Sequence, residues 1–214
     1  MRPIRSFVLR QGRTTPAQQR ALTELLPKYG LQFKDSPLDS PFGRKAPLVL
    51  EIGSGMGETT AAIAQARPDA DFIAVEVHGP GVGSLLNRIE SLGLTNLKVI
   101  RHDAADVLEK MIADGALAAL HLFFPDPWPK KRHHKRRLVQ PEFAALAARK
   151  LAAGGVLHAA TDWPDYAEHM QAVLLKEPLL QEVHTGFVER PATKFENRGK
   201  RLGHPIRDLY FRRR

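Results

Sequence analysis

Residues 48–57 read Leu48-Val49-Leu50-Glu51-Ile52-Gly53-Ser54-Gly55-Met56-Gly57, an apolar run that ends in three closely spaced glycines. A short apolar run bounded by glycine predicts a buried strand. Glycines at its end permit a tight turn and let a ligand approach the backbone closely. Residues 59–66, which follow, are predicted to form a helix. Together these features predict a strand–loop–helix unit of an α/β sheet, with a ligand at the loop.

Strand and helix patterns alternate through the rest of the chain. We predict further strands at 71–76, 97–100, 117–124 and 155–160, and helices at 83–92, 105–113, 140–151 and 166–175. Residues 179–187 and 206–212 also have the composition of strands. This alternation implies right-handed crossovers and a largely parallel sheet covered on both faces.

The composition favours a polyanionic partner. The chain has 32 Lys and Arg residues against 23 Asp and Glu residues, a formal net charge of +9. Cysteine is absent, which excludes disulfides, thiolate metal sites and a cysteine nucleophile. This absence fits a reducing compartment, and we expect a cytoplasmic protein. No apolar stretch is long enough to span a bilayer, so we expect no membrane partner.

The N-terminal residues differ in composition from the rest of the 214-residue chain. Residues 1–46 hold nine basic residues against three acidic ones and are interrupted by several prolines. Thr15-Pro16 favours the start of a short helix, and we expect the remainder to be an extended lead-in. We therefore predict a basic N-terminal arm over residues 1–46 and a single domain over residues 47–214.

Acidic residues recur at or just past the ends of the predicted strands: Glu51, Glu76, Asp103, Asp126 and Asp162. Ligands of such sheets bind beyond the carboxyl ends of the strands, so we expect these carboxylates to gather at one site. The glycine spacing does not match the dinucleotide fingerprint G-x-G-x-x-G, and acidic neighbours disfavour a pyrophosphate. S-adenosylmethionine is cationic and has no phosphate, so it suits this loop better.

Two of these acids suit particular groups of that cofactor. Glu76 closes the second strand, where a carboxylate can accept hydrogen bonds from both ribose hydroxyls, although this alone also suits NAD. Asp103 follows the third strand and is placed to accept from the adenine amino group. A glycine loop alone is weak evidence, because such loops also occur as structural turns.

A second stretch points to the substrate. Residues 123–130 read Phe123-Phe124-Pro125-Asp126-Pro127-Trp128-Pro129-Lys130 and continue as Lys131-Arg132-His133-His134-Lys135-Arg136-Arg137. A carboxylate beside aromatic rings suits a planar heterocycle that carries N–H donors, and the positive charges suit a phosphate backbone. A charge run is also typical of a solvated loop. The adjacent histidines have no third ligand at suitable spacing, so we expect no metal.

These motifs resemble those of a known family. Residues 50–57 resemble motif I of class I S-adenosylmethionine-dependent methyltransferases, and residues 124–130 resemble the signature of bacterial tRNA (guanine-N7-)-methyltransferases. The similarity covers nearly the whole chain and includes Arg5-Ser6-Phe7, Gly12-Arg13, Asp162-Trp163, Thr193-Lys194-Phe195-Glu196 and Arg198-Gly199. It implies the class I methyltransferase fold: an α/β, Rossmann-like, doubly wound, mostly parallel seven-stranded sheet with helices on both faces.

The resemblance also implies roles for individual residues. S-adenosylmethionine would be bound by Glu51, Gly53, Gly55, Glu76, Asp103 and Asp126, and Asp126 would also be the catalytic residue. The substrate guanosine would be contacted by Lys130, Asp162, Thr193, Lys194, Phe195 and Glu196. The RNA would be contacted by Arg132, His133, His134, Lys135, Arg136 and Arg137. The product would be N7-methylguanosine in the variable loop of tRNA, made by a monomer or a homodimer.

The chemistry of guanine gives Asp126 a role. N7 carries an in-plane lone pair and no hydrogen, so a general base is not obligatory. Asp126 fits better as an acceptor for the guanine N1–H and amino group, which would stabilise the positive charge that develops on the ring. Trp128 or Phe124 would stack on the base, although core packing explains Trp128 nearly as well. We expect the nucleotide to leave its stack.

Other readings of the sequence stay open. The chain is also compatible with a methyltransferase that acts on another RNA base. A non-catalytic RNA-binding protein with a vestigial cofactor pocket is a further alternative. Asp162 precedes Trp163-Pro164 and is equally suited to cap the next helix.

Overall fold

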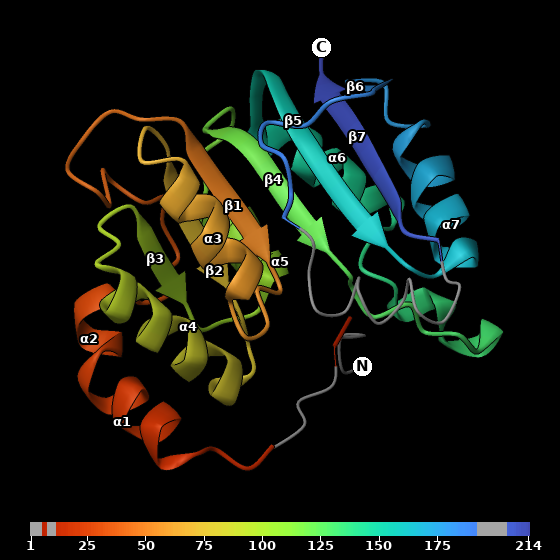
Figure 1. The fold of residues 1–214 in the computed structure, drawn as a ribbon. Helices are drawn as coiled ribbons and strands as arrows, with labels where there is room; N and C mark the ends of the chain where they lie inside the picture. The colour runs from red at the N-terminus through yellow and green to blue at the C-terminus, as the bar shows by residue number, and fades with distance from the viewer. Residues whose placement is uncertain (1–5, 8–11, 192–204) are drawn as a thin grey trace.

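The computed structural model describes residues 6–7, 12–191 and 205–214. Within them, seven strands form one sheet in the order β3-β2-β1-β4-β5-β7-β6 (Figure 1). The first five strands are parallel, and β7 is antiparallel to both of its neighbours. The predicted α/β, mostly parallel sheet is therefore confirmed. The strands are β1 (Leu48–Ile52), β2 (Asp71–Val75), β3 (Leu97–Ile100), β4 (Leu117–Phe123), β5 (Leu151–Thr161), β6 (Leu180–Val183) and β7 (Arg207–Arg213).

Helices cover both faces of the sheet (Figure 1). One face packs against α1, α3 and α4, and the other against η1, α6 and α7. The helices are α1 (Pro16–Glu24), α2 (Leu26–Tyr29), α3 (Glu58–Ala66), α4 (Gly79–Leu92), α5 (Ala104–Asp106), the π-helix η1 (Val107–Met111), the 3₁₀-helix η2 (Lys131–Arg136), α6 (Pro141–Lys150) and α7 (Pro164–Leu174).

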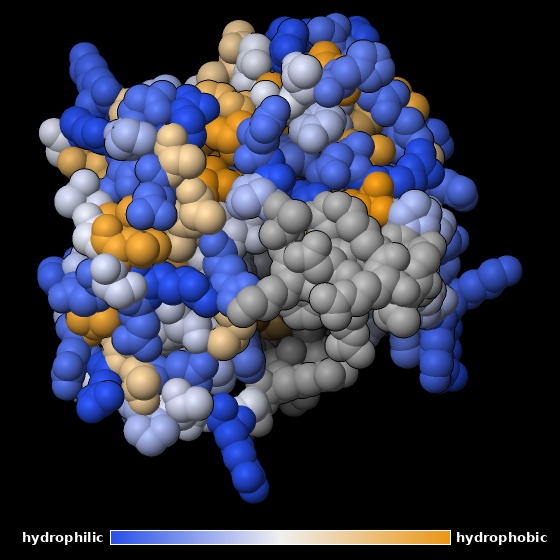
Figure 2. All heavy atoms as spheres, viewed as in Figure 1, coloured by the Kyte–Doolittle hydropathy of each residue, from blue (hydrophilic) through white to orange (hydrophobic). Residues whose placement is uncertain are grey.

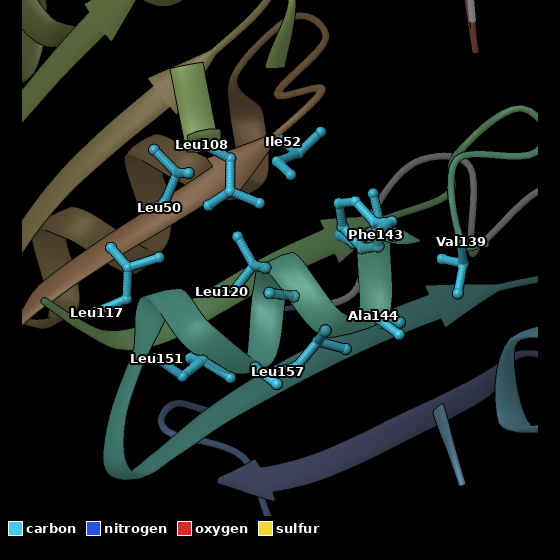
Figure 3. Close-up of a cluster of buried hydrophobic side chains, with 14 of the residues drawn as sticks. Leu50, Ile52, Leu108, Leu117, Leu120, Val139, Phe143, Ala144, Leu151 and Leu157 are labelled. Atoms are coloured by element: carbon cyan, nitrogen blue, oxygen red, sulfur yellow. The ribbon is translucent and has the colours of Figure 1, made fainter. Parts of the chain in front are cut away.

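The core lies between the sheet and its two helical layers. Leu50, Leu120 and Leu157 of three adjacent strands lie in one cluster with Phe143 and Ala144 of α6 (Figure 3). Burial of each large apolar side chain contributes about 1.5–3 kcal/mol. β2 is buried along its whole length, as expected for a central parallel strand covered on both faces. This packing fixes the strands so that their carboxyl ends meet at one edge.

Several element boundaries differ from the sequence-based expectation. The helix predicted at 83–92 begins at Gly79, because Pro80 fits the first turn of a helix. The helix predicted at 105–113 consists instead of the single turn α5 and the π-helix η1. β5 starts directly at the end of α6, before its predicted start. The alternation of strands and helices is unchanged by these differences.

The segment before β1 begins with a well-capped helix. Thr15 Oγ1 accepts a hydrogen bond from Gln18 N, and the Gln18 side chain accepts one from Thr15 N, which together form a capping box. α1 then lies against α4 (Figure 1). A Cβ atom at Gly83 of α4 would lie only 2.7 Å from the carbonyl oxygen of Gln18, so the two helices approach each other as closely as a glycine allows.

The same segment then runs along the open edge of the sheet. Leu31 N donates to Val99 O of β3 at 2.8 Å, and Gly30 forms a β-bridge with Val99. The sequence predicts an extended lead-in here, and the structure shows that it is docked by backbone hydrogen bonds.

Most apolar side chains are inside the molecule. On the face shown in Figure 2, hydrophilic side chains predominate and hydrophobic ones form small, separate groups. Among the described residues, no helix combines the length and the apolar character needed to cross a membrane.

We expect Gly83→Ala to destabilise the protein. Overpacking costs about 1–3 kcal/mol, more than the roughly 1 kcal/mol that alanine contributes over glycine in a helix. Urea denaturation should show a lower free energy of unfolding. Ser91→Ala, on the exposed side of the same helix, is the matched control and should change stability by less than about 0.5 kcal/mol. A Gly83→Ala protein as stable as the control would contradict the close contact.

Candidate active site

A cavity of about 220 Å³ opens at the edge where β1, β2 and β4 end. Three acids line it, Glu76, Asp103 and Asp126, and among the described residues no lysine or arginine does. Its other lining residues include Ser6, Phe7, Gly53, Phe123, Phe124 and Leu138. The lining therefore suits a cationic ligand and does not suit a phosphate.

Glu76 organises the glycine loop between β1 and α3. Its Oε2 accepts a hydrogen bond from Gly55 N, and its Oε1 accepts from Val77 N and His78 N, each at 2.8 Å. Gly55 has a φ of +56°, which glycine adopts without the steric cost that a Cβ atom brings. A carboxylate accepts about four hydrogen bonds, so these three leave capacity for a ligand hydroxyl. Glu76 thus both holds the loop and lines the cavity.

Glu51 lies behind the loop and is not a lining residue of the cavity. It is 5% exposed, and its Oε1 accepts a hydrogen bond from Thr60 Oγ1 of α3 at 2.9 Å. Burial raises the pKa of Glu51 to about 7, the Thr60 hydrogen bond opposes this rise, and the charge of Glu76 adds to it. Glu51 is therefore poised between its neutral and ionised forms near neutral pH. Gly55 is not a lining residue of the cavity either, and its N–H is bonded to Glu76.

Asp103 has a structural contact as well as a place in the cavity. It is the N-cap residue of α5, and its Oδ1 accepts a hydrogen bond from Ala105 N at 3.0 Å. This bond fixes the side chain beside the cavity. The position predicted for Asp103 from the end of the third strand therefore agrees with its place in the structure.

Residues 124–130, the signature loop, hold an unusual backbone conformation. Phe124 and Trp128 have φ values of +52° and +46°, although each carries a large side chain and precedes a proline. Such conformations cost about 1–3 kcal/mol each and persist only when neighbouring contacts enforce them. Asp126 lies midway between the two and is exposed at the cavity. The loop therefore presents its carboxylate from a constrained backbone.

The Trp128 ring is held on several sides. Its Nε1 donates a hydrogen bond to Ser6 O at 3.0 Å, and the guanidinium of Arg136 lies 4.8 Å from the ring centroid. The His133 ring meets it edge-on at 5.9 Å. These contacts favour the packing alternative for Trp128 over a role as a base-stacking platform. They also explain why Ser6, far away in the sequence, lies at the cavity.

The other end of the loop is contacted from the segment that follows β6. The Arg190 guanidinium lies 5.7 Å from the Phe123 ring centroid and 5.3 Å from that of Phe124. Arg190 also pairs with Asp208 of β7 at 3.2 Å, and Asp208 contacts His158 of β5 at 2.7 Å. A charge network thus joins the C-terminal strands to Phe124.

The basic run forms η2, and most of it faces solvent. Lys130, Lys131, Arg132 and Lys135 are exposed, and His133, His134 and Arg136 are partly exposed. Burial and then the positive charges of Arg132 and Arg136 lower the pKa of His133, so this side chain is neutral near pH 7. A second cavity, lined by Lys135 and Arg136, shares Ser6, Asp103 and Leu138 with the first.

Arg137 differs from the rest of the run. Its side chain is only 1% exposed, and it is bonded to Pro127 O and paired with Asp165. These tertiary contacts draw this one charge into the protein. The RNA contact predicted for Arg137 therefore stays a prediction, and the burial of the guanidinium disfavours it.

The remaining predicted substrate residues are only partly described. Asp162 is half-buried between β5 and α7 and is not a lining residue of the cavity. The N-cap residue of α7 is Trp163, so the capping alternative for Asp162 does not hold. Thr193, Lys194, Phe195 and Glu196 lie outside the described residues. Sequence reasoning missed Ser6 and Phe7 as lining residues, although the motif Arg5-Ser6-Phe7 was a signal for them.

The site combines an acidic pocket with a basic rim. The described residues contain no group of three or more His, Asp or Glu side chains that could hold a metal ion. The carboxylates of Glu76, Asp103 and Asp126, in a lining whose described residues include no lysine or arginine, fit the sulfonium and ammonium charges of S-adenosylmethionine. The charged rim of η2 fits a polyanion beside it.

Solved structures share this fold. A 16S rRNA methyltransferase, KamB, aligns with a TM-score of 0.59 and 16% identity over 83% of this chain and 94% of that chain. A SAM-dependent methyltransferase from Aquifex aeolicus aligns with a TM-score of 0.55 and 15% identity over 81% of this chain and 86% of that chain. The protein has the fold of the class I S-adenosylmethionine-dependent methyltransferases.

Sequence comparison is more specific. The model of a putative methyltransferase family matches residues 45–209. A tRNA (guanine-N(7)-)-methyltransferase of Aromatoleum aromaticum is 58% identical over 100% of this chain and 85% of its own length. One of Methylobacillus flagellatus is 57% identical over 100% of this chain and 92% of its own length. The chain belongs to the tRNA (guanine-N(7)-)-methyltransferase family and is an enzyme.

We expect Glu51 to make stability depend on pH. Its pKa is about 7 in the folded protein against an ordinary value of 4.5, so the folded state holds its proton more tightly. The free energy of unfolding should fall as pH rises from about 4.5 to about 7 and stay level above that. Glu51→Gln should abolish this fall and raise stability at pH 8 by up to about 3 kcal/mol.

Urea denaturation at pH 5 and pH 8 measures this effect. Glu168→Gln, on the exposed side of α7, is the control and should leave the pH dependence unchanged. A Glu51→Gln protein whose stability falls between the two pH values as much as the wild type would show that Glu51 is not the group responsible.

Proposed function

We propose that this enzyme transfers a methyl group from S-adenosylmethionine to N7 of a guanine in the variable loop of tRNA. The observation that carries the proposal is an acidic cavity, lined by Glu76, Asp103 and Asp126, beside the basic helix η2. Relatives more than half identical over the full chain carry the name of this activity, which supports the choice of base and RNA.

Each acidic residue of the cofactor site would bind a different group of S-adenosylmethionine. Glu76 lies at the end of β2 and would accept from a ribose hydroxyl, while it also fixes the glycine loop. Asp103, at the start of α5, would accept from the adenine amino group. Gly53 lines the cavity without a side chain and lets a ligand approach the backbone. When bound, S-adenosylmethionine supplies an electrophilic methyl group.

Asp126 would act on the guanine. Its carboxylate is exposed at the cavity and can accept hydrogen bonds from the N1–H and amino group of a base. These bonds strengthen as N7 is methylated and the ring becomes positive, so they stabilise the transition state more than the substrate. Because N7 has no proton to lose, Asp126 serves as an electrostatic stabiliser. The prolines on both sides hold it in place before the base arrives.

The exposed charges of η2 would hold the RNA. Lys131, Arg132 and Lys135 of this helix face solvent next to the signature loop. Contacts with phosphates supply affinity and position rather than sequence specificity. A guanine held in folded tRNA must leave its stack to enter the cavity, as in other enzymes that modify bases.

Mapping the product tests the proposal directly. Unmodified tRNA is incubated with the protein and S-adenosylmethionine, and N7-methylguanosine is located by borohydride–aniline cleavage. Cleavage at a variable-loop guanine is the expected result. Methylation of another base would support a different specificity, and cofactor binding by calorimetry without turnover would support a non-catalytic RNA-binding protein.

We expect Asp126→Ala to separate catalysis from binding. Loss of a preorganised electrostatic partner lowers turnover by about 10²–10³-fold, whereas tRNA affinity should be retained because η2 is untouched. Single-turnover methylation and filter binding measure the two quantities. Asp126→Asn keeps an acceptor oxygen and loses the charge. Its turnover should lie between those of the wild type and Asp126→Ala. Equal losses of affinity and turnover in Asp126→Ala would contradict the assigned role.

We expect replacement of Lys131, Arg132 and Lys135 by glutamine to weaken tRNA binding. Each lost phosphate contact lowers the salt dependence of the binding constant by about 0.7–0.9 log units per decade of salt. The salt slope of the triple variant should therefore be lower by about 2.1–2.7 log units per decade of salt. The control is Lys176→Gln, an exposed position beyond the C-terminal end of α7. An unchanged salt slope in the triple variant would exclude η2 as the phosphate-binding surface.

A further inference from the structure

Arg137 has contacts that set it apart from the other charges of its run. Its side chain is 1% exposed, and its Nε donates a hydrogen bond to the carbonyl oxygen of Pro127 at 2.9 Å. Pro127 is the residue directly after Asp126. A buried guanidinium therefore binds the backbone of the signature loop one residue from the carboxylate assigned to catalysis.

The same guanidinium is fixed from the opposite side by α7. Its Nη2 donates to Asp165 Oδ2 in the first turn of that helix, and its centre lies 4.9 Å from the buried Tyr166 ring. The hydrogen bond from Arg137 holds the pKa of Asp165 below its ordinary value, so this partner stays ionised at neutral pH. Arg137 Nη2 also lies 3.1 Å from His134 Nε2. Arg137 thus links the signature loop to a helix that packs on the sheet.

The backbone of the loop requires such a link. Phe124 and Trp128 hold left-handed φ values immediately before prolines, a conformation that the loop would leave if nothing held it. Pro127 lies between these two residues, and its carbonyl oxygen accepts the Arg137 hydrogen bond. A charged donor gives a stronger and more directional bond than a neutral one. The contact is therefore placed to keep the loop in its constrained form.

We propose that Arg137 is a positioning residue of this enzyme: it acts through Pro127 to hold Asp126 at the cavity, and Asp165 holds Arg137. The proposal rests on the proposed function, in which Asp126 stabilises the reacting guanine. The basic run would then have two functions. The exposed residues of η2 would bind the RNA, and the buried Arg137 that follows them would hold the signature loop. Arg137 itself makes no contact with the RNA.

Kinetics and binding distinguish this role from an RNA contact. Arg137→Met removes the hydrogen-bonding fork and keeps an apolar stem. It should lower kcat about 10²-fold, the loss typical of a small misplacement of a reacting group. The dissociation constant for tRNA and its salt slope should stay at the wild-type values. Arg132→Met, at an exposed position of the same run, is the positive control for an RNA contact and should lower the salt slope by about 0.7–0.9.

Asp165→Asn provides a second variant in case Arg137→Met folds poorly. The Asp165 side chain is 60% exposed, so its replacement does not open the core. This variant should lower kcat about 10-fold, and adding it to Arg137→Met should cause no further loss, because both changes break one link. Additive losses, or an unchanged kcat in Asp165→Asn, would overturn the role given to Asp165.

Fluorine NMR reports on the loop without reference to activity. The chain has two tryptophans, so protein labelled with 5-fluorotryptophan should give two resonances, assigned with Trp163→Phe. The Trp128 resonance should shift or broaden in Arg137→Met, in which α7 itself is unchanged, and the Trp163 resonance should change less.

The two readouts separate the proposals. If wild-type protein does not methylate tRNA, the proposed function fails, while the Trp128 resonance still tests the link between Arg137 and the loop. An unchanged Trp128 resonance in Arg137→Met, together with a reduced salt slope and a wild-type kcat, would overturn the positioning role and make Arg137 an RNA contact.

Discussion

The carboxylate of Glu76 is the interaction on which the cofactor half of the site depends. It accepts three backbone hydrogen bonds, one from the glycine loop after β1 and two from the junction between β2 and α4. α4 confines the same loop from the other side, since a Cβ atom at Gly81 would lie 2.5 Å from Gly55 O. Contacts from two elements therefore hold the loop in place beside the cavity.

The substrate half of the site depends instead on the constrained signature loop and on the arginines that contact it. Its central residue, Asp126, belongs to a loop with an intrinsically unfavourable backbone, and buried cations contact this loop at its first residue and at its middle. Arg190 lies against the Phe124 ring, and Arg137 binds Pro127 O. Each arginine is paired with an aspartate on another element. The geometry of the carboxylate is therefore coupled to the packing of α7 and β7, which do not line the cavity.

The sequence was sufficient for the sheet and for the acidic cavity, because both follow from local patterns. Apolar runs that end in Gly53 or in Glu76 mark buried strands, and acids after such strands gather at one edge of the sheet. The docking of α1 on α4 could not be predicted, since it depends on the fit of Gly83 to the Gln18 backbone. The burial of Arg137 could not be predicted either, because a run of basic residues gives no signal for which side chain is buried.

The pairing of Leu31 with Val99 has a consequence for how this chain can be shortened. β3 is the last strand on its side of the sheet, and the N-terminal segment occupies part of its outer row of donors and acceptors. An uncovered row of this kind is a template on which a second molecule can add its own strand. A fragment that starts at β1 would expose this template.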